Sequence, residues 1–295
     1  MPVNGCDCSI VIKTSNRETD IPYSEETIRE AVSVLQEEAA IEGDGVCKGI
    51  RKVVGVTGCV VTPLTLGTAP ILLYLAMGAV GKPVFVSETK NLFRYFLSLL
   101  PMEDSDCFDL VQDRGQERRL YENCCIIGFE LRFMRGEAVK LKLDVSGERL
   151  PRVYPYTEST QSQTTKLSGT VIGKERFSGD FTSYWINGKE YKNIYGVILS
   201  CKKEGGTKTE LWIKRVLENN NDFPSSIEEF IISAQLIKDS YEYRHFGTFR
   251  ITVKRLVMVS DETDINSIDA VVGPLRFYVS GTVTTEVFTL GEVAV

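Results

Sequence analysis

The chain has 295 residues, a formal net charge of −6, 43% hydrophobic residues and 25% charged residues. This composition is typical of a soluble globular protein that is long enough to bury a sizeable core. A tight non-specific nucleic-acid binder needs clustered Lys and Arg, so the acidic balance argues against that class. No basic leader opens the chain, and its most apolar stretch, residues 62–83, is too interrupted by Gly and Pro to span a membrane.

The cysteine pattern favours free thiols in a reducing cytoplasm. An even number of cysteines does not by itself indicate disulfides in a chain of this size without a leader. Cys125 is expected on the apolar face of a strand, where a free thiol packs as a small hydrophobe. No Cys-x-x-Cys pair occurs, so no zinc or other metal site is expected. The eight residues are Cys6, Cys8, Cys47, Cys59, Cys107, Cys124, Cys125 and Cys201.

Residues 24–39, SEETIREAVSVLQEEA, predict an amphipathic helix. Ser24 can cap its start, and the two glutamates that follow suit the positive end of the helix dipole. Apolar residues recur at helical spacing at Ile28, Ala31, Val32 and Leu35. We therefore expect an N-terminal arm and helix over residues 1–50, separate from a β-rich domain over residues 51–295.

The domain begins with a predicted strand at residues 53–62, which are rich in β-branched side chains. A buried helix is expected over residues 66–79, where the sequence is apolar on all sides. Two further strands are expected within residues 91–100 and 107–113, and the second leads into a turn around residues 113–115.

The most regular pattern lies in residues 121–148, where two alternating runs flank a turn at residues 135–137 and predict a β-hairpin. One face of the hairpin carries apolar residues: Cys125, Ile127, Phe129, Leu131, Phe133, Val139, Leu141, Leu143 and Val145. The opposite face carries charged residues: Glu130, Arg132, Lys140, Lys142 and Asp144. These five charged residues are the candidate functional residues of the chain.

After this hairpin, residues 151–170 lose periodicity and predict a long exposed loop. The pairs Asn187-Gly188 and Gly205-Gly206 each predict the turn of a further hairpin. Residues 225–238 fit a helix capped by Ser225 or Ser226, with a strand as the alternative. The helix would turn four residues inward: Ile227, Phe230, Ile231 and Ala234. Strands are expected again over residues 247–260 and 274–290.

These elements predict a mainly β (α+β) fold, an antiparallel β-sandwich or barrel with two or three packed helices. Catalytic signatures are missing. The single histidine, His245, lies beside aromatic residues, where a structural role is more common. Two glycine-containing loops lack the residues of nucleotide-binding motifs, and acidic clusters near residues 103–109 and 261–269 match no calcium loop. We therefore expect no enzyme and no cofactor, and instead a structural or assembly protein.

In this order of features the chain resembles the major tail tube proteins of long-tailed bacteriophages and prophage-derived tail-like particles. The resemblance covers most of the chain. It is carried by a strand and small-residue helix at 56–81, the paired strands at 107–147 with their Gly-Glu turn, and the closing strands at 249–262 and 273–290. These are patterns of hydrophobicity and turn placement, and their order carries the resemblance.

The resemblance implies a subunit that closes into a ring, commonly a hexamer, with rings stacked into a hollow tube. It implies assembly in the bacterial cytoplasm into a virion tail, with a tape-measure protein, a tail terminator and baseplate proteins as partners. Double-stranded DNA would pass through the lumen without tight binding. The five charged residues named above would then face the lumen, where a net-negative wall lets the duplex slide.

Two alternatives remain open at this point. The chain fits another tail component, such as a terminator, baseplate or contractile-system tube protein. It also fits a non-enzymatic β-sandwich that binds carbohydrate or protein, for which exposed aromatic residues would form the platform: Tyr154, Tyr156, Tyr184 and Trp185.

Overall fold

The computed structural model describes residues 8–14, 18–36, 49–78, 84–87, 92–101, 104, 106–114, 117–147, 152–155, 176–216, 223–236, 248–261 and 272–290. Within these residues the chain forms one sheet of 19 strands and one helix, and every strand pairing is antiparallel. The predicted mainly β class is therefore confirmed.

The elements in chain order are β1 (Cys8–Lys13), β2 (Glu18–Ile21), β3 (Glu25–Glu26), β4 (Arg29–Gln36), β5 (Gly49–Pro63), α1 (Ala69–Met77), β6 (Val84–Ser87), β7 (Leu92–Ser98), β8 (Phe108–Arg114), β9 (Glu117–Met134), β10 (Lys140–Gly147), β11 (Arg152–Pro155), β12 (Phe177–Ile186), β13 (Lys189–Glu190), β14 (Ile194–Lys202), β15 (Lys208–Val216), β16 (Ser226–Leu236), β17 (Thr248–Asp261), β18 (Val272–Val279) and β19 (Val283–Leu290).

The 18-residue strand β9 connects the two halves of the molecule. Along one edge it pairs first with β8 and then with β14, and along the other it pairs with β11 and then β10. From β10 the sheet continues to β5, and from β14 it continues through β15 and β18 to β17. Beyond β17 lie β16 and β12 on one side, and β19, β7 and β6 on the other.

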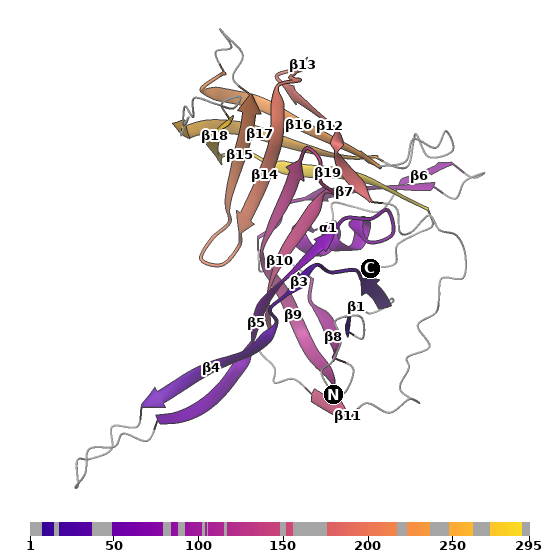
Figure 1. Ribbon diagram of the computed structural model, residues 1–295, viewed down its shortest axis with the longest axis vertical. Helices are drawn as coiled ribbons and strands as arrows, with labels where there is room; N and C mark the ends of the chain where they lie inside the picture. The colour runs from indigo at the N-terminus through magenta and orange to yellow at the C-terminus, as the bar shows by residue number, and fades with distance from the viewer. Residues whose placement is uncertain are drawn as a thin grey trace.

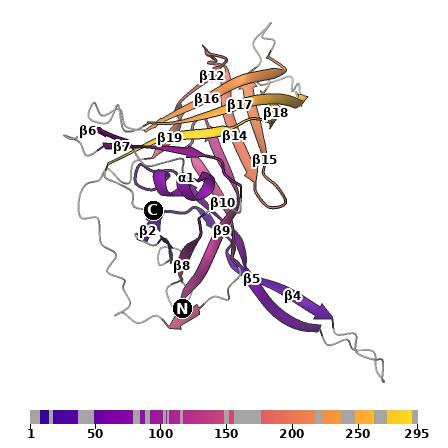
Figure 2. The ribbon, with the colours of Figure 1, turned by 180° about the vertical axis from the view of Figure 1, so that it is seen from behind.

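The sheet folds over on itself to enclose the core. Strands β16, β17 and β19 run across the direction of β9, β10 and β14 in the upper half of the molecule (Figures 1 and 2). Aromatic rings fill the space between: Phe249 of β17 lies 5.9 Å from Phe133 of β9 and 4.8 Å from Phe177 of β12, measured between ring centroids. All three are buried, so this is a sandwich-like core made by non-neighbouring strands.

Helix α1 confirms the predicted buried helix, although it spans only residues 69–77 of the expected 66–79. Eight of its nine residues are buried, and only Tyr74 reaches the surface, as expected for a helix that is apolar on all sides. It lies in the middle of the molecule, packed against β7, β19 and β9 (Figure 1). Gly78 ends it with φ of 103°, a conformation that favours glycine.

Two predicted helices are wrong. Residues 29–36 form β4, which pairs along its whole length with β5, and the two strands form a ribbon that projects from the body (Figures 1 and 2). Residues 226–236 form β16, in agreement with the strand alternative. In this strand Ile232 rather than Ile231 points inward with Phe230 and Ala234, because side chains alternate with a period of two. In both cases pairing with a distant strand outweighs local helical spacing.

The predicted hairpins are confirmed. Strands β9 and β10 flank a turn in which Gly136 has φ of 82°. Strands β12 and β13 flank Asn187 and Gly188, whose φ angles of 48° and 82° suit a tight two-residue turn. Strands β14 and β15 flank the Gly205-Gly206 turn.

The proposed division at residue 50 does not match the packing. Strand β1 pairs with β8 of the body, and Ile10 and Ile12 belong to the common core. In the predicted loop at 151–170, residues 152–155 form β11 on the edge of β9, whereas residues 156–170 lie outside the described residues.

Candidate functional site

The five charged residues predicted from the hairpin lie together on the outer surface of the sheet. In register, Lys140 of β10 lies opposite Arg132 of β9, and Lys142 lies opposite Glu130. Asp144 lies opposite Gly128, next along the same face. The structure thus brings all five to one surface, as the sequence predicted.

This surface continues across three more strands in rows of directly opposed residues. Arg132 lies opposite Ile198 of β14, and that row continues through Trp212 of β15 to Arg276 of β18. Glu130 lies opposite Ser200, and that row continues through Glu210 to Tyr278. We call the surface formed by these rows the charged face. It comprises Gly128, Glu130, Arg132, Lys140, Lys142, Asp144, Ile198, Ser200, Lys202, Glu210, Trp212, Arg276 and Tyr278.

The opposite side of the same strands is entirely buried. Between the two charged rows lies a row of apolar residues that point into the core: Leu141, Leu131, Leu199, Leu211 and Phe277. Each is fully buried, so a shift of one residue in register would expose this row and bury the charges. The hydrophobic effect therefore fixes which side of the sheet carries the charged face.

The charges on this face are paired with one another. Lys142 Nζ lies 3.2 Å from Asp144 Oδ1, and Arg132 forms an ion pair with Glu130. Lys140 Nζ donates a hydrogen bond of 2.9 Å to Glu137 in the hairpin turn. Because each of these cations has an acidic neighbour, the hairpin presents little net field to a charged partner in solution.

The second cluster of charge involves Arg276, whose guanidinium binds Glu210 through two hydrogen bonds of 3.0 and 2.6 Å. The guanidinium also lies over the ring of Trp212, 5.0 Å from its centroid. No pattern in the sequence singles out these three residues. The alternation in residues 208–216 and 274–279 was visible, but only the register of β15 with β18 shows that their charged residues meet.

The ion pairs shift the titration of both clusters. Burial alone would lower the pKa of Lys142, but the hydrogen bond and charge of Asp144, with smaller effects of Cys59 and Glu130, outweigh burial and raise it. The hydrogen bond from Arg276 lowers the pKa of Glu210, against the opposing effect of partial burial. Lys142 and Glu210 are therefore charged at neutral pH.

One part of the predicted apolar face is wrong. A β-bulge shifts the register of β9 against β10, so that Asp144 pairs with Gly128 and Val145 pairs with Ile126. Ile127 is the extra residue of β9, and the alternation of inward and outward side chains is reversed on its N-terminal side. Cys124 and Ile126 are therefore buried, whereas the predicted Cys125 and Ile127 are only half-buried on the outer side.

Both edges of β9 and β10 are occupied within the chain. Strand β10 lies between β9 and β5, and over residues 128–132 β9 lies between β10 and β14. Contacts between copies of the chain through paired strands must therefore use other edges than those of this hairpin. Among the described strands, β4 pairs only with β5, so its outer edge is available.

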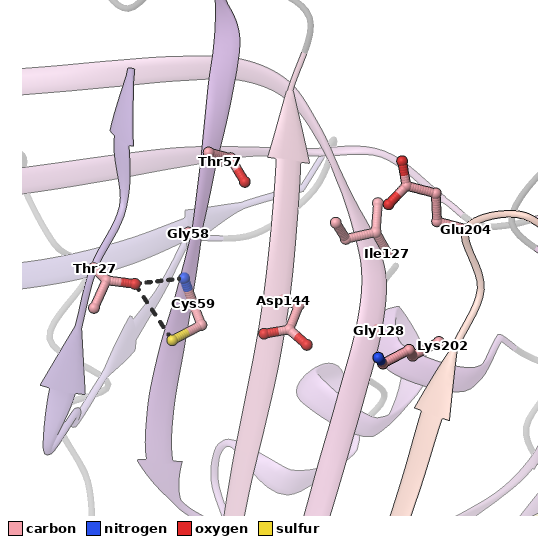
Figure 3. Close-up of a pocket in the computed structure, with 9 residues that line it drawn as sticks. All are labelled: Thr27, Thr57, Gly58, Cys59, Ile127, Gly128, Asp144, Lys202 and Glu204. Atoms are coloured by element: carbon pink, nitrogen blue, oxygen red, sulfur yellow. Dashed lines mark hydrogen bonds between the residues drawn. The ribbon is translucent and has the colours of Figure 1, made fainter. Parts of the chain in front are cut away.

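A shallow depression of about 410 Å³ lies at the end of the charged face nearest β5. Gly128 forms its floor between Asp144 of β10 and Lys202 of β14 (Figure 3). At its rim, Thr27 Oγ1 lies 3.4 Å from Cys59 Sγ and accepts a hydrogen bond of 3.0 Å from the Cys59 backbone N–H. The lining is mixed in charge and open to solvent, so it resembles a surface groove more than a substrate pocket.

The other sequence candidates do not assemble a site. His245 and residues 262–271 lie outside the described residues. In the first acidic cluster, Asp106 accepts a hydrogen bond from Tyr74 and Asp109 accepts one from the Asn123 backbone N–H. The prediction that Tyr184 is an exposed member of an aromatic platform is wrong. This residue is buried, and its hydroxyl lies 3.5 Å from the Phe133 carbonyl oxygen.

Within the described part of the chain, no three His, Cys, Asp or Glu side chains are grouped closely enough to hold a metal ion. No helix among the described residues is long and apolar enough to cross a membrane. No protein-family model matches the chain, and no curated protein matches it.

Proposed function

We propose that this protein is the structural subunit of a phage-type tail tube, and that its charged face lines the bore of a ring. The observation that carries the proposal is the charged face itself, a multi-strand surface on which Arg132, Lys142 and Arg276 are each paired with a carboxylate. An antiparallel sheet keeps one face on the core and one toward water, and in a ring of such sheets the watery face becomes the wall of the channel.

The pairing of charges suits a conduit for DNA. An unpaired cation on the wall would bind phosphate and release counterions, and many such contacts would hold the duplex in place. Here Arg132, Lys142 and Arg276 each contact a carboxylate of the same face. A wall of this kind remains well hydrated but offers DNA little to bind, so the duplex can slide.

The ribbon of β4 and β5 supports assembly. It leaves the body of the molecule in both views (Figures 1 and 2), and a two-stranded ribbon alone in water is only marginally stable. Contact with another copy would bury it and would cover the outer edge of β4, which otherwise invites uncontrolled pairing. We propose that this ribbon makes the contact between neighbouring copies, within a ring or between stacked rings.

On this proposal the partners are further copies of the same chain, a tape-measure protein, and the terminator and baseplate proteins that end the tube. The assembled protein belongs to a virion tail that is built in the bacterial cytoplasm. Rings that close by head-to-tail contacts are commonly hexamers in such tubes, so we propose a hexamer.

Negative-stain electron microscopy and sedimentation velocity of the purified protein over a range of concentrations test the proposal. We expect rings or tubes of uniform diameter with a central bore, and sedimenting species larger than a monomer. A protein that remains monomeric at every concentration would contradict it. A monomer that binds carbohydrate on a glycan array would instead favour the β-sandwich binding module.

A further inference from the structure

Cys107 and Cys125 form a close pair of thiols on the outer side of the sheet, where β8 pairs with β9. Phe108, the first residue of β8, pairs with Cys124 of β9, so the next position places Cys107 opposite Cys125. Phe108 and Cys124 point into the core, and their neighbours point outward: Cys107 is exposed and Cys125 is half-buried. The two sulfur atoms lie in contact, 2.9 Å apart, so a disulfide of about 2.05 Å would form with a movement of less than about 1 Å.

The pair lies where β9 changes neighbours. Strand β8 leaves β9 at Cys124, and β14 joins it from Gly128 onward. The register of β9 is irregular on both sides of this point, near Asn123, whose φ is 57°, and again at Ile127. A covalent link between β8 and β9 here would fix the junction between the two halves of the molecule.

The surroundings favour reaction at Cys107 and Cys125 over reaction at the adjacent Cys124. Cys124 is buried, and burial, with smaller effects of nearby charges, raises its pKa to about 12, so it stays a thiol. The backbone N–H of Lys203 donates a hydrogen bond of 2.8 Å to the carbonyl oxygen of Ile127, two residues beyond Cys125. A charge on Cys125 interacts favourably with the Lys203 ammonium, although burial lowers the pKa of Lys203 overall.

We propose that Cys107 and Cys125 are an oxidisable pair that closes to an intramolecular disulfide when the protein meets a low-molecular-weight disulfide such as oxidised glutathione. This inference is independent of the proposed ring. In a reducing cytoplasm the pair stays open, and in an oxidising medium it closes.

The exchange proceeds in two steps. The exposed Cys107 thiolate attacks one sulfur of the small disulfide, whose S–S bond breaks, and the first small thiolate leaves with the proton that Cys107 gave up. The Cys125 thiolate then attacks the Cys107 sulfur and expels the second small thiolate, which takes the proton of Cys125. The two protein thiols lose two electrons, and the small disulfide gains them as it becomes two thiols.

The test is oxidation of the full chain with excess oxidised glutathione, followed by alkylation, proteolysis and mass spectrometry. We expect a peptide pair linked through Cys107 and Cys125. We also expect Tm to rise by about 5 °C, reversed by dithiothreitol, because the link closes a short loop of a long chain. Wild-type protein that keeps both thiols alkylatable, stops at a glutathione adduct, or links into dimers would overturn the proposal.

Variants separate the chemistry from folding. Cys125→Ser should leave a stable glutathione adduct on Cys107, and Cys107→Ser should give no linked peptide. Both should match the Tm of the wild type under reducing conditions, because a half-buried or exposed sulfur is replaced by a similar group. Cys59→Ser removes a half-buried thiol of β5 that contacts Thr27, and it should link and respond to oxidant as the wild type does. Linkage that persists in Cys107→Ser, or is lost in Cys59→Ser, would contradict the assignment.

Discussion

At the scale of single residues, Asn187 has two separate roles in the turn between β12 and β13. Its φ of 48° lies in the left-handed region, which Asn adopts more readily than most residues. Its side-chain oxygen also accepts hydrogen bonds of 3.1 and 3.0 Å from the backbone N–H groups of Glu228 and Glu229. The turn is therefore tied to the start of β16, a contact that the Asn-Gly motif alone does not predict.

Substitutions at this position should separate the two roles. Asn187→Gly keeps the turn conformation but loses both hydrogen bonds, and should lower the free energy of unfolding by about 1 kcal/mol. Asn187→Ala loses the two hydrogen bonds and also disfavours the left-handed backbone conformation, so it should lower the free energy of unfolding by about 2 kcal/mol. Asn187→Asp keeps the acceptor and serves as the control. Urea denaturation measures all three, and equal effects of the Gly and Ala variants would show that backbone strain contributes nothing.

The Glu210–Arg276 pair predicts an acid-dependent loss of stability. The pKa of Glu210 is held below its ordinary value of 4.5, chiefly by the hydrogen bond from Arg276. The stabilisation is therefore fully present above pH 4.5 and is lost as the pH falls through the lowered pKa of the folded state. Both side chains are about one-third exposed, so solvent screening limits the effect to about 0.5–1 kcal/mol.

Glu210→Gln removes this titration. At pH 7 the variant should unfold at slightly lower urea concentration than the wild type, and the two curves should converge as the pH is lowered below 4.5. Glu190→Gln, an exposed position on β13, is the matched control and should track the wild type at every pH. A difference between Glu210→Gln and wild type that stays constant down to low pH would argue against the ion pair as its cause.

At the scale of elements, local patterns predicted the strands of three hairpins that carry recognisable turn residues. The β9–β10, β12–β13 and β14–β15 hairpins each carry their turn residues and alternation between them, so their register could be inferred. Helix α1 was recognisable because it is apolar on all sides. The five charged residues were correctly placed on one face because the alternation of side chains along a strand assigns faces without knowledge of the fold.

The failures have a common physical cause. Residues 29–36 and 226–236 show helical spacing, but their backbone hydrogen bonds are made with β5, β12 and β17, partners that no local pattern identifies. The bulge at Ile127 was missed because it inverts the alternation for only a few residues. Likewise, Glu210 and Arg276 are 66 positions apart and meet only through the pairing of β15 with β18.

The β4–β5 ribbon gives a prediction at this scale. Because Ala31 pairs with Gly55, replacing residues 32–54 with Asn-Gly should close the ribbon next to the body in a two-residue turn. We expect the shortened protein to keep the circular dichroism and cooperative unfolding of the wild type, since the ribbon projects away from the core. Sedimentation velocity should show that it no longer forms particles larger than a monomer. Assembly equal to that of the wild type would remove the ribbon from the contact between copies.

At the scale of the whole molecule, the balance of charge on the charged face matters more than the net charge of −6. The net charge suits a net-negative wall, whereas the hairpin is mixed in sign, with three cations and two anions among its five predicted residues and Glu137 as a further partner. If this face lines a channel, as we propose, pairing of its cations with carboxylates is the feature that would weaken DNA binding.

This balance can be removed without changing the fold. Glu130→Gln with Asp144→Asn leaves Arg132 and Lys142 without their carboxylate partners. We expect fluorescence anisotropy to show tighter binding to double-stranded DNA, with the slope of log K against log salt steeper by about 2. The control, Glu190→Gln with Glu228→Gln, changes the net charge equally at exposed positions away from the charged face. Equal gains in both double variants would mean that only net charge matters.

The orientation of the charged face in the assembled particle tests the central claim most directly. A cryo-electron microscopy map of the purified assembly, with side chains resolved, shows where Lys140, Lys142 and Asp144 lie. We expect a ring with a central bore whose wall carries these three residues and, beside them, the row from Arg132 to Arg276. A map in which this face lies on the outside of the particle, or is buried between subunits, would contradict the account.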